Sequence, residues 1–342
     1  MFSKIKEIYQ ALGDDASRRI FSHRLLFNIS DDRQHLVDMI CSLDNVTNAD
    51  TLREYAAGTC TAPCVVFGAG SMAQHCIADF NLPVICFCDN DPQKQGTTVA
   101  GKPVISFDRL LTDYRHCIVV VGTVHTAEIV RQLREHMFPE SQIIACEGAQ
   151  YFDPVVPHSP NEVFVDAGAC DGMNSVDFIQ WCGGQFDRIV LLEPDPQNLS
   201  RVHKNMLGHV PESISKITCV AAGLGEENGT ARFCLSHDYN TRLDEQGGQT
   251  IRIQALDSLL LGQYASFVKM DIEGAELAAL RGAKETIRVH KPCLAISIYH
   301  KSEDILDIPL YILELSAEYV FYLRHYTLDA IETVLYAIPR NK

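Results

Sequence analysis

Two glycine-rich turns, each lying between an apolar strand and a helix, constrain most strongly what this chain can fold into. The first turn, GAGS at residues 68–71, follows the apolar run CVVF, and the second, DAGACDG at residues 166–172, follows the apolar run VFV. Glycine allows a sharp change from strand to helix and a close approach of the backbone to a ligand. Strands that alternate with helices form parallel sheets with right-handed crossovers. The sequence therefore predicts two α/β units, one built around each turn.

The chain length and a proline-rich stretch suggest where these units begin and end. The 342 residues exceed the length of one ordinary domain, which is roughly 100–200 residues. Residues 151–160 carry three prolines and are typical of a linker. Before residue 60, apolar residues recur at helical spacing. We predict a helical appendage over 1–60, a doubly wound Rossmann-like domain over 61–150 and a larger domain of the same class over 151–342.

The expected strands and helices alternate in both halves. In the first half we predict strands at 64–68, 84–89, 118–122 and 142–146, with helices over 72–80 and 126–136. In the second half we predict strands at 163–166, 188–193, 216–222, 267–272, 293–299, 319–324 and 333–339, with helices over 172–182, 196–206, 274–282 and 303–316. No helix separates the last two strands, so they are expected to form a hairpin. This pattern predicts a seven-stranded sheet with six parallel strands and one antiparallel strand.

The net charge limits the partners of the chain. A formal charge of -15 at pH 7 repels nucleic-acid phosphates and anionic lipid heads, so we expect neither nucleic acid nor membrane as a partner. No stretch approaches the roughly 18–20 consecutive apolar residues of a membrane span, and the N-terminus lacks the apolar core of a signal peptide. The 13 cysteines are interpreted as thiols in a reducing compartment. We therefore expect a cytoplasmic protein.

The first turn has the surroundings of a dinucleotide-binding fingerprint. Gly68 and Gly70 would allow the backbone to approach a pyrophosphate, Ser71 opens the helix, and Asp89 closes the next strand, where an acid reaches a ribose hydroxyl. Two other interpretations stay open. One is a domain of this fold that binds no ligand. The other is an NAD(P)-dependent oxidoreductase, for which the sequence offers only His125 as a catalytic group after the third strand.

The second turn favours S-adenosylmethionine (SAM), which has an amino acid head, a sulfonium and a ribose but no pyrophosphate. Asp166 suits the ammonium group and the positive sulfur, Gly168 lets the backbone approach the ligand, and Gly172 opens the helix. Glu193 closes the next strand and can accept hydrogen bonds from both ribose hydroxyls. The alternative, a second dinucleotide site, lacks the compact glycine triplet.

These segments occur in an order that resembles FkbM-type SAM-dependent methyltransferases. The resemblance covers roughly residues 161–340 and rests on VFVDAGACDGMNSVDF, LLEPDPQNL, VAAGLGEENGTARF, IQALDSLL and FVKMDIEGAELAALRGA. It implies a class I methyltransferase fold and O-methylation of a hydroxyl on a small molecule or sugar-containing acceptor. It also implies that Asp166, Gly168, Glu193, Ala221 and Ala222 line the SAM pocket. The chain departs from many members at residues 173–175, Met-Asn-Ser, where an aromatic residue or Thr is common.

Methylation of a neutral hydroxyl needs a nearby base, and two residues at strand ends are candidates. Asp271 follows one strand and His300 follows the next, so both are expected at the carboxyl edge of the sheet, where ligands of such folds bind. We predict that both act on the acceptor. Lys269 is expected to form a structural ion pair, and Glu276 to favour its helix dipole.

Other residues of the second half have weaker functional interpretations. His325 is interpreted either as a second imidazole at the site or as an ordinary loop residue. Asp271 with the two histidines offers ligands that suit a divalent metal, but three scattered residues do not support a metal prediction. The loop Asn240-Thr241-Arg242 is either an acceptor contact or an ordinary surface loop.

The first half also resembles the nucleotide-sensing N-terminal domains of some sugar-modifying enzymes, on the segment from Asp89 to Val104. This resemblance keeps a further alternative open. The chain would then be a non-catalytic protein that senses a nucleotide sugar and only binds SAM.

Overall fold

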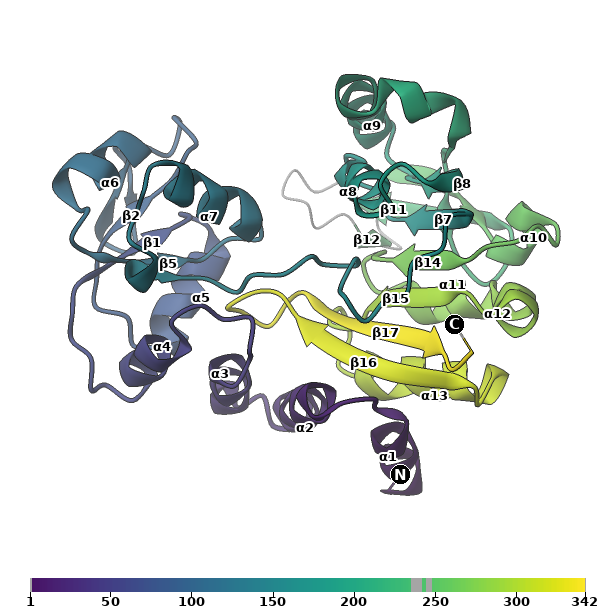
Figure 1. Cartoon of the computed structure of the whole chain (residues 1–342), viewed down its shortest axis with the longest axis horizontal. Helices are drawn as coiled ribbons and strands as arrows, with labels where there is room; N and C mark the ends of the chain where they lie inside the picture. Colours follow the sequence, from purple (N-terminus) through teal and green to yellow (C-terminus); the bar gives the residue numbers. More distant parts are fainter. Residues whose placement is uncertain (1, 235–241, 244–247, 342) are drawn as a thin grey trace. The chain divides into compact units, whose positions relative to one another are not determined.

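The computed structural model describes residues 2–234, 242–243 and 248–341 (Figure 1). Its contacts form two compact units. We call residues 19–149 and 325–332 the six-stranded unit, and residues up to 18, 150–324 and from 333 onward the seven-stranded unit, after their largest sheets. Among the described residues, none of the helices combines the length and apolar composition that a membrane crossing requires.

The six-stranded unit has the strand order β3-β4-β2-β1-β5-β6. Its strands are β1 (Cys64–Phe67), β2 (Val84–Cys88), β3 (Thr98–Val99), β4 (Lys102–Ile105), β5 (Ile118–Val121) and β6 (Ile143–Ile144), and its helices after residue 60 are α5 (Ser71–Asp79), α6 (Phe107–Asp113) and α7 (Thr126–Glu135). β1 is buried along its whole length and pairs in parallel with β2 and β5. The predicted parallel sheet is confirmed, and β3, β4 and α6 are additions that the sequence analysis missed.

The segment predicted to be helical, residues 1–60, contains α1 (Phe2–Ala11), α2 (Asp15–Ser30), α3 (Arg33–Cys41) and α4 (Ala49–Ala56). The six-stranded unit also contains the loop 325–332. In that loop the buried carboxylate of Asp329 accepts hydrogen bonds from Arg33 at 2.8 Å and contacts the imidazole of His75 at 2.7 Å. Residues distant in sequence therefore join one compact unit through charge-assisted hydrogen bonds.

The seven-stranded unit has the strand order β16-β17-β15-β14-β7-β8-β9. The strands are β7 (Glu162–Ala167), β8 (Phe186–Leu192), β9 (Ile217–Val220), β14 (Phe267–Met270), β15 (Cys293–Ser297), β16 (Tyr319–His325) and β17 (Thr333–Pro339). β7 pairs in parallel with β8 and β14, whereas β17 pairs antiparallel with β15. The predicted seven-stranded doubly wound sheet is confirmed. The strand order reverses between β7 and β14, and such a switch point is where open α/β sheets bind ligands.

The helices between these strands also follow the prediction closely. They are α8 (Met173–Trp181), α9 (Pro196–His209), α11 (Glu276–Arg281) and α13 (Asp304–Leu315), joined by two helices that were not predicted, α10 (Leu256–Leu260) and α12 (Lys284–His290). A second sheet was also missed. It has the order β10-β13-β11-β12 and comprises β10 (Gly223–Leu224), β11 (Gly229–Cys234), β12 (Arg242–Leu243) and β13 (Gln249–Gln254). In β13, Ile251 and Ile253 alternate with polar residues, so this strand carried a periodic signal that the sequence analysis missed, whereas β10 and β12 have only two residues each.

The N-terminal residues cover the edge strand of the seven-stranded sheet. The Gly13 N–H donates to the carbonyl of Phe321 at 2.8 Å, and the Leu323 N–H donates to the Ser17 hydroxyl at 2.9 Å. Helix α1 contacts α13 in the same unit. These bonds satisfy backbone groups of β16 that an uncovered edge would leave open to pairing with another chain.

Candidate active site

A buried ion pair lies at the switch point of the seven-stranded sheet. Register places Asp166 of β7 beside Lys269 of β14, and their charged atoms are 3.1 Å apart with neither side chain exposed. The second oxygen of Asp166 accepts a 2.7 Å hydrogen bond from Ser175, a residue of the segment that departs from the FkbM pattern. The structural ion pair expected for Lys269 is confirmed. Asp166 has these protein partners, and its contact with SAM stays a prediction.

Lys269 also holds the glycine-rich turn. Its ammonium donates to the carbonyl of Gly168 at 2.7 Å and lies 5.1 Å from the ring centre of Tyr151. Burial lowers the pKa of Lys269, but the negative charges of Asp166 and Asp271 outweigh that effect and leave the pKa above its ordinary value. Lys269 is therefore charged, and it ties β14 to the turn that follows β7.

Two positions of the turn require glycine, Gly168 because of both its packing and its φ, and Gly172 because of its φ. Gly168 has φ +74°, and a Cβ atom at this position would overlap the carbonyl oxygen of Asp271. Gly172 has φ +84°, is the N-cap of α8, and would place a Cβ atom 2.9 Å from the Met206 side chain. Side chains are disfavoured at such φ values whatever the space. The backbone of Gly168 therefore closely approaches the backbone of Asp271, at the end of β14.

Glu193 directly follows β8 and is anchored against the same turn. One carboxylate oxygen accepts the N–H of Cys170 at 2.9 Å, and the other accepts the N–H of Asp195 at 2.9 Å. Burial raises the pKa of Glu193 above its ordinary value despite these bonds. The side chain of Asn198 donates to the same carboxylate at 3.4 Å, so about one of its roughly four acceptor sites remains for a ligand hydroxyl.

The other predicted cofactor contacts lie beyond β9. That strand ends at Val220, earlier than predicted, and is followed by an exposed Ala221 and a buried Ala222. Of the predicted polar loop, Asn240 and Thr241 lie outside the described residues, and Arg242 begins β12.

Asp271 follows β14 directly and accepts hydrogen bonds from two tyrosines. The hydroxyl of Tyr151 donates to one carboxylate oxygen at 2.8 Å, and the hydroxyl of Tyr299 donates to the other at 3.3 Å. Sequence analysis missed both: Tyr151 lies in the proline-rich segment and carries no local signal, whereas Tyr299 precedes the predicted His300 and was a detectable neighbour. The two phenols orient the Asp271 carboxylate at the carboxyl edge of the sheet.

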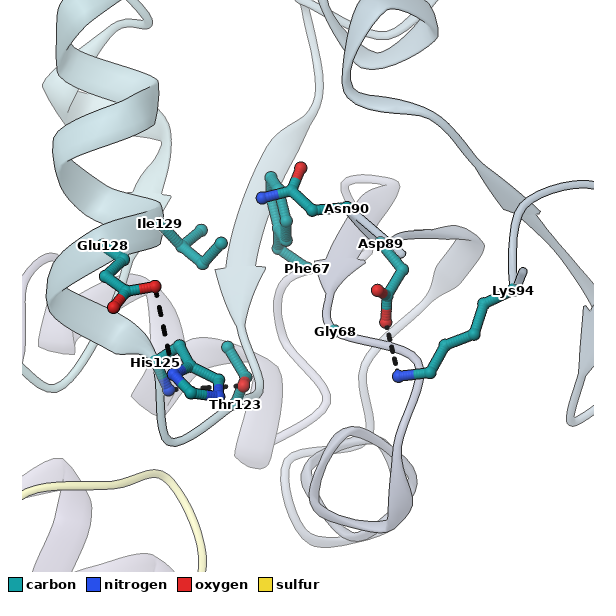
Figure 2. Close-up of a pocket in the computed structure, with 9 residues that line it drawn as sticks. All are labelled: Phe67, Gly68, Asp89, Asn90, Lys94, Thr123, His125, Glu128 and Ile129. Carbon is teal, nitrogen blue, oxygen red and sulfur yellow. Dashed lines mark hydrogen bonds and ion pairs between the residues drawn. The ribbon is translucent and has the colours of Figure 1, made fainter. Parts of the chain in front are cut away.

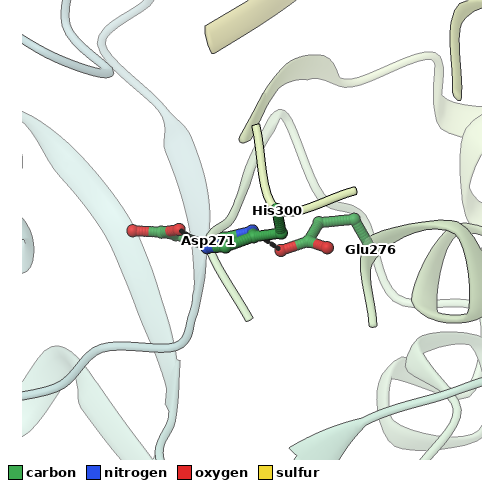
Figure 3. Close-up of side chains that lie close together, drawn as sticks. All are labelled: Asp271, Glu276 and His300. Atoms are coloured by element: carbon green, nitrogen blue, oxygen red, sulfur yellow. Dashed lines mark ion pairs between the residues drawn. The ribbon is translucent and has the colours of Figure 1, made fainter. Parts of the chain in front are cut away.

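The imidazole of His300 lies among three carboxylates, two of which are drawn with it in Figure 3. Nε2 is 3.6 Å from Asp271 and 3.5 Å from Glu273, and Nδ1 is 2.9 Å from Glu276. The structure therefore brings Asp271 and His300 together at one edge. The helix-dipole role expected for Glu276 is incomplete, because its buried carboxylate also contacts His300.

These carboxylates change the protonation state of His300. Burial lowers the pKa of the imidazole, but the close contact and charge of Glu276 and the charges of Asp271 and Glu273 outweigh it and raise the pKa to about 9. Burial raises the pKa of Glu273 to about 7. At pH 7 His300 is therefore an imidazolium, which must lose its proton before it can act as a base.

Potential ligand atoms of Asp271, Glu276 and His300 lie within 4.8 Å of one another, close enough for the three residues to share a metal ion. However, the imidazole ring lies between the two carboxylates, and each nitrogen faces a different one (Figure 3). The three groups therefore face one another in pairs along the ring instead of converging on one point. His325, the other histidine considered, is part of the six-stranded unit and is buried, which lowers its pKa to about 3.

The six-stranded unit has a separate cavity of about 210 Å³ at the carboxyl ends of β1, β2 and β5 (Figure 2). The predicted residues Gly68 and Asp89 line it, whereas Gly70 and Ser71 begin α5 and are not among the residues that line it. Asp89 accepts the N–H groups of Ala69 and Asp91 at 2.9 Å and pairs with Lys94 at 3.1 Å. Its carboxylate thus braces the glycine turn, and its contact with a ribose stays a prediction. The remaining lining residues are Phe67, Asn90, Thr123, His125, Glu128 and Ile129.

Comparison with known families decides what the seven-stranded unit is. Residues 166–321 match the model of the methyltransferase FkbM domain. Residues 166–321 are an FkbM methyltransferase domain. Residues 61–144 match the model of the C2185-like N-terminal domain. The FkbM domain includes Asp166, Glu193, Asp271 and His300, so the candidate site belongs to a methyltransferase.

Solved structures are similar to the whole chain or to about half of it. The crystal structure of methyltransferase FkbM from Methylobacillus flagellatus KT covers 91% of this chain and 100% of its own at 23% identity and a TM-score of 0.50. A putative methyltransferase from Streptococcus mutans in complex with SAH covers 52% and 88% at 11% identity and a TM-score of 0.33. An rRNA methylase from Streptococcus thermophilus covers 53% and 87% at 14% identity and a TM-score of 0.35. No curated protein matches the chain. The comparisons give the oxidoreductase alternative no support.

Proposed function

We propose that the FkbM domain is a SAM-dependent methyltransferase that methylates a hydroxyl on a small molecule or sugar-containing acceptor. The observation that carries this proposal is the cluster of Asp271 and His300, which follows β14 and β15 beside the Gly168 turn of β7. The net charge of -15 favours a small acceptor over a nucleic acid, because phosphates would be repelled.

The residues of the turn suit SAM. Glu193 would hold the ribose hydroxyls, since its carboxylate is fixed by two backbone N–H groups beside the turn. Gly168, Gly172, Ala221 and Ala222 would supply small surfaces for the rest of the molecule. Asp166 would contribute negative charge near the sulfonium, partly compensated by Lys269. When bound, SAM supplies an electrophilic methyl group, and the protein's task is to orient the acceptor.

The acceptor hydroxyl would lie near Asp271 and His300. SAM would supply the methyl group and keep the electron pair of the broken carbon–sulfur bond, and the acceptor oxygen would gain the new bond to carbon. The hydroxyl proton then passes to Nε2 of a His300 ring that has become neutral. Asp271, held by Tyr151 and Tyr299, would accept a hydrogen bond and orient the hydroxyl.

The cofactor assignment is tested at Glu193. We expect Glu193→Ala to weaken SAM binding by about 1–3 kcal/mol, the usual loss for hydrogen bonds to a charged group. Calorimetry measures the affinity, and Glu193→Gln separates the loss of charge from the loss of the anchored side chain. Asp187→Asn, an exposed carboxylate at the start of the same strand, is the matched control. Unchanged SAM affinity in Glu193→Ala would exclude the ribose assignment.

We propose separately that the cavity of the six-stranded unit binds the phosphate-bearing part of a nucleotide and does not bind SAM. The cavity lies where sheets of this kind hold phosphates, and Lys94 offers a cation there. About 210 Å³ is less than the roughly 300–1,000 Å³ of pockets for drug-sized ligands, so the cavity would enclose only part of a nucleotide.

Lys94→Ala tests this second proposal. If UDP or NAD binds by calorimetry, we expect the variant to weaken it by about 1.5–3 kcal/mol, since a charge-assisted hydrogen bond to phosphate is lost. Lys102→Ala, an exposed lysine of β4, is the control. Failure of both nucleotides to bind at millimolar concentration would support a domain that serves only as a scaffold.

A further inference from the structure

The FkbM domain contains a fully buried carboxylate, Glu276, that has no part in the proposed reaction. Glu276 is the first residue of α11 and has no exposed surface. One of its oxygens contacts Nδ1 of His300 at 2.9 Å and also accepts the N–H of Ile272 at 2.9 Å. The other oxygen has no hydrogen-bond partner among the described residues. A buried carboxylate is costly unless a cation compensates it, and the nearest imidazole is His300.

We infer that Glu276 is a positioning residue, which holds the Nδ1–H of His300 so that Nε2 is the nitrogen that takes the acceptor proton. Only the transfer of the acceptor proton to Nε2 rests on the proposed function. The orientation of the imidazole is a property of the protein without ligands.

Geometry distinguishes the two nitrogens of the ring. The nitrogen that donates to a carboxylate fixes the tautomer, and the other nitrogen is left for chemistry. Nδ1 makes the closest charged contact, 2.9 Å from a Glu276 oxygen without the geometry of a normal hydrogen bond, whereas Nε2 is 3.5 Å from Glu273 and 3.6 Å from Asp271. N–H···O bonds are typically about 2.7–3.2 Å, so neither carboxylate occupies Nε2 as a normal partner. In the neutral ring the proton is therefore expected on Nδ1, with the lone pair on Nε2.

The charged groups near the ring come from α11, from α13 and from the segment between β14 and α11, and one neighbouring ring is aromatic. Glu276 lies on α11, Asp271 and Glu273 lie between β14 and α11, Tyr299 lies 4.1 Å away as a neighbouring ring, and Asp304 of α13 interacts with Glu276. The ammonium of Lys301 donates to the carbonyl of Gly274. Carboxylates thus predominate and favour the imidazolium.

The excess of carboxylates around His300 determines how stability and methyl transfer depend on pH. The folded pKa of His300, about 9, lies above the ordinary value of 6.5. The stabilisation by the charged ring is fully present below pH 6.5 and is lost as pH rises through about 9. Methyl transfer should change in the opposite direction, with a rate that rises as Nε2 loses its proton toward pH 9.

Glu276→Gln tests the inference, because the amide oxygen can still accept the Nδ1–H but carries no charge. In the full-length protein, NMR titration of the His300 ring, assigned with His300→Gln, should show a midpoint that moves from about 9 toward 6.5. The rising limb of the pH–rate profile should move by the same amount. Glu303→Gln, an exposed carboxylate three residues from His300, should change neither.

A second measurement needs no variant at Glu276 and no acceptor. In the wild-type protein above pH 9.5, ¹⁵N chemical shifts of the His300 ring should show the proton on Nδ1. A proton on Nε2, or an unmoved titration midpoint in Glu276→Gln, would overturn the inference. A midpoint that moves while the rate profile stays in place would overturn Nε2 as the proton acceptor. Failure of the proposed function itself is recognised separately, as absence of SAM binding by calorimetry.

Discussion

Lys269→Met is expected to lower the free energy of unfolding by about 3–5 kcal/mol, the usual result of breaking a buried ion pair by removing one partner. Neither Lys269 nor Asp166 has exposed surface, so the variant leaves a carboxylate without its counter-charge. The carbonyl of Gly168 also loses its ammonium donor. Urea denaturation followed by circular dichroism measures the change, and this loss should exceed that of any surface variant.

Two comparisons separate the charge effect from the loss of packing. The double variant Asp166→Leu with Lys269→Met should recover part of the loss, since two apolar side chains leave no buried charge. Arg109→Met removes one member of an exposed pair with Asp113 and should cost less than about 1 kcal/mol. If Lys269→Met is no more costly than Arg109→Met, the ion pair does not stabilise the switch point of the sheet.

His300→Ala is expected to lower the kcat of methyl transfer by about 10²–10⁴-fold while SAM affinity changes little, which is the typical effect of losing acid–base help. Asp271→Asn should act in the same direction, because its carboxylate lies 3.6 Å from Nε2 of His300 and is held by two tyrosines. Calorimetry gives the SAM affinity, and a methyl-transfer assay with an identified acceptor gives kcat. His203→Ala, an exposed histidine of α9, is the matched control.

The outcomes of this experiment separate the possible roles. Full turnover in His300→Ala would mean that positioning of the acceptor suffices and that the base assignment is wrong. Loss of SAM binding in Asp271→Asn would place Asp271 among the cofactor contacts. If a chelator stops turnover and magnesium or manganese restores it, a metal ion rather than a simple base assists the transfer.

Local patterns were sufficient to predict the central parallel strands of both large sheets. The apolar runs that became β7, β8, β14 and β15 are buried along nearly their whole length, so a short continuous run of apolar residues identified each one. Helix bounds at α8 and α9 were predicted to within a few residues at each end, because caps and helical spacing are also local signals. β10 and β12 are too short, at two residues each, to carry such a signal, whereas the alternation of Ile251 and Ile253 in β13 was missed.

The sequence by itself also determined that two residues of the site, Asp271 and His300, lie close together. Asp271 and His300 follow neighbouring parallel strands, and parallel strands end at one edge of a sheet, so their proximity followed from topology. By contrast, the partners of these residues were decided only by tertiary structure. Tyr151 reaches Asp271 from 120 positions away, and Ser175 reaches Asp166 across the glycine turn. Whether Glu276 supports its own helix or holds His300 depends on side-chain packing between α11 and the end of β15, and periodicity along the chain carries no information about such contacts.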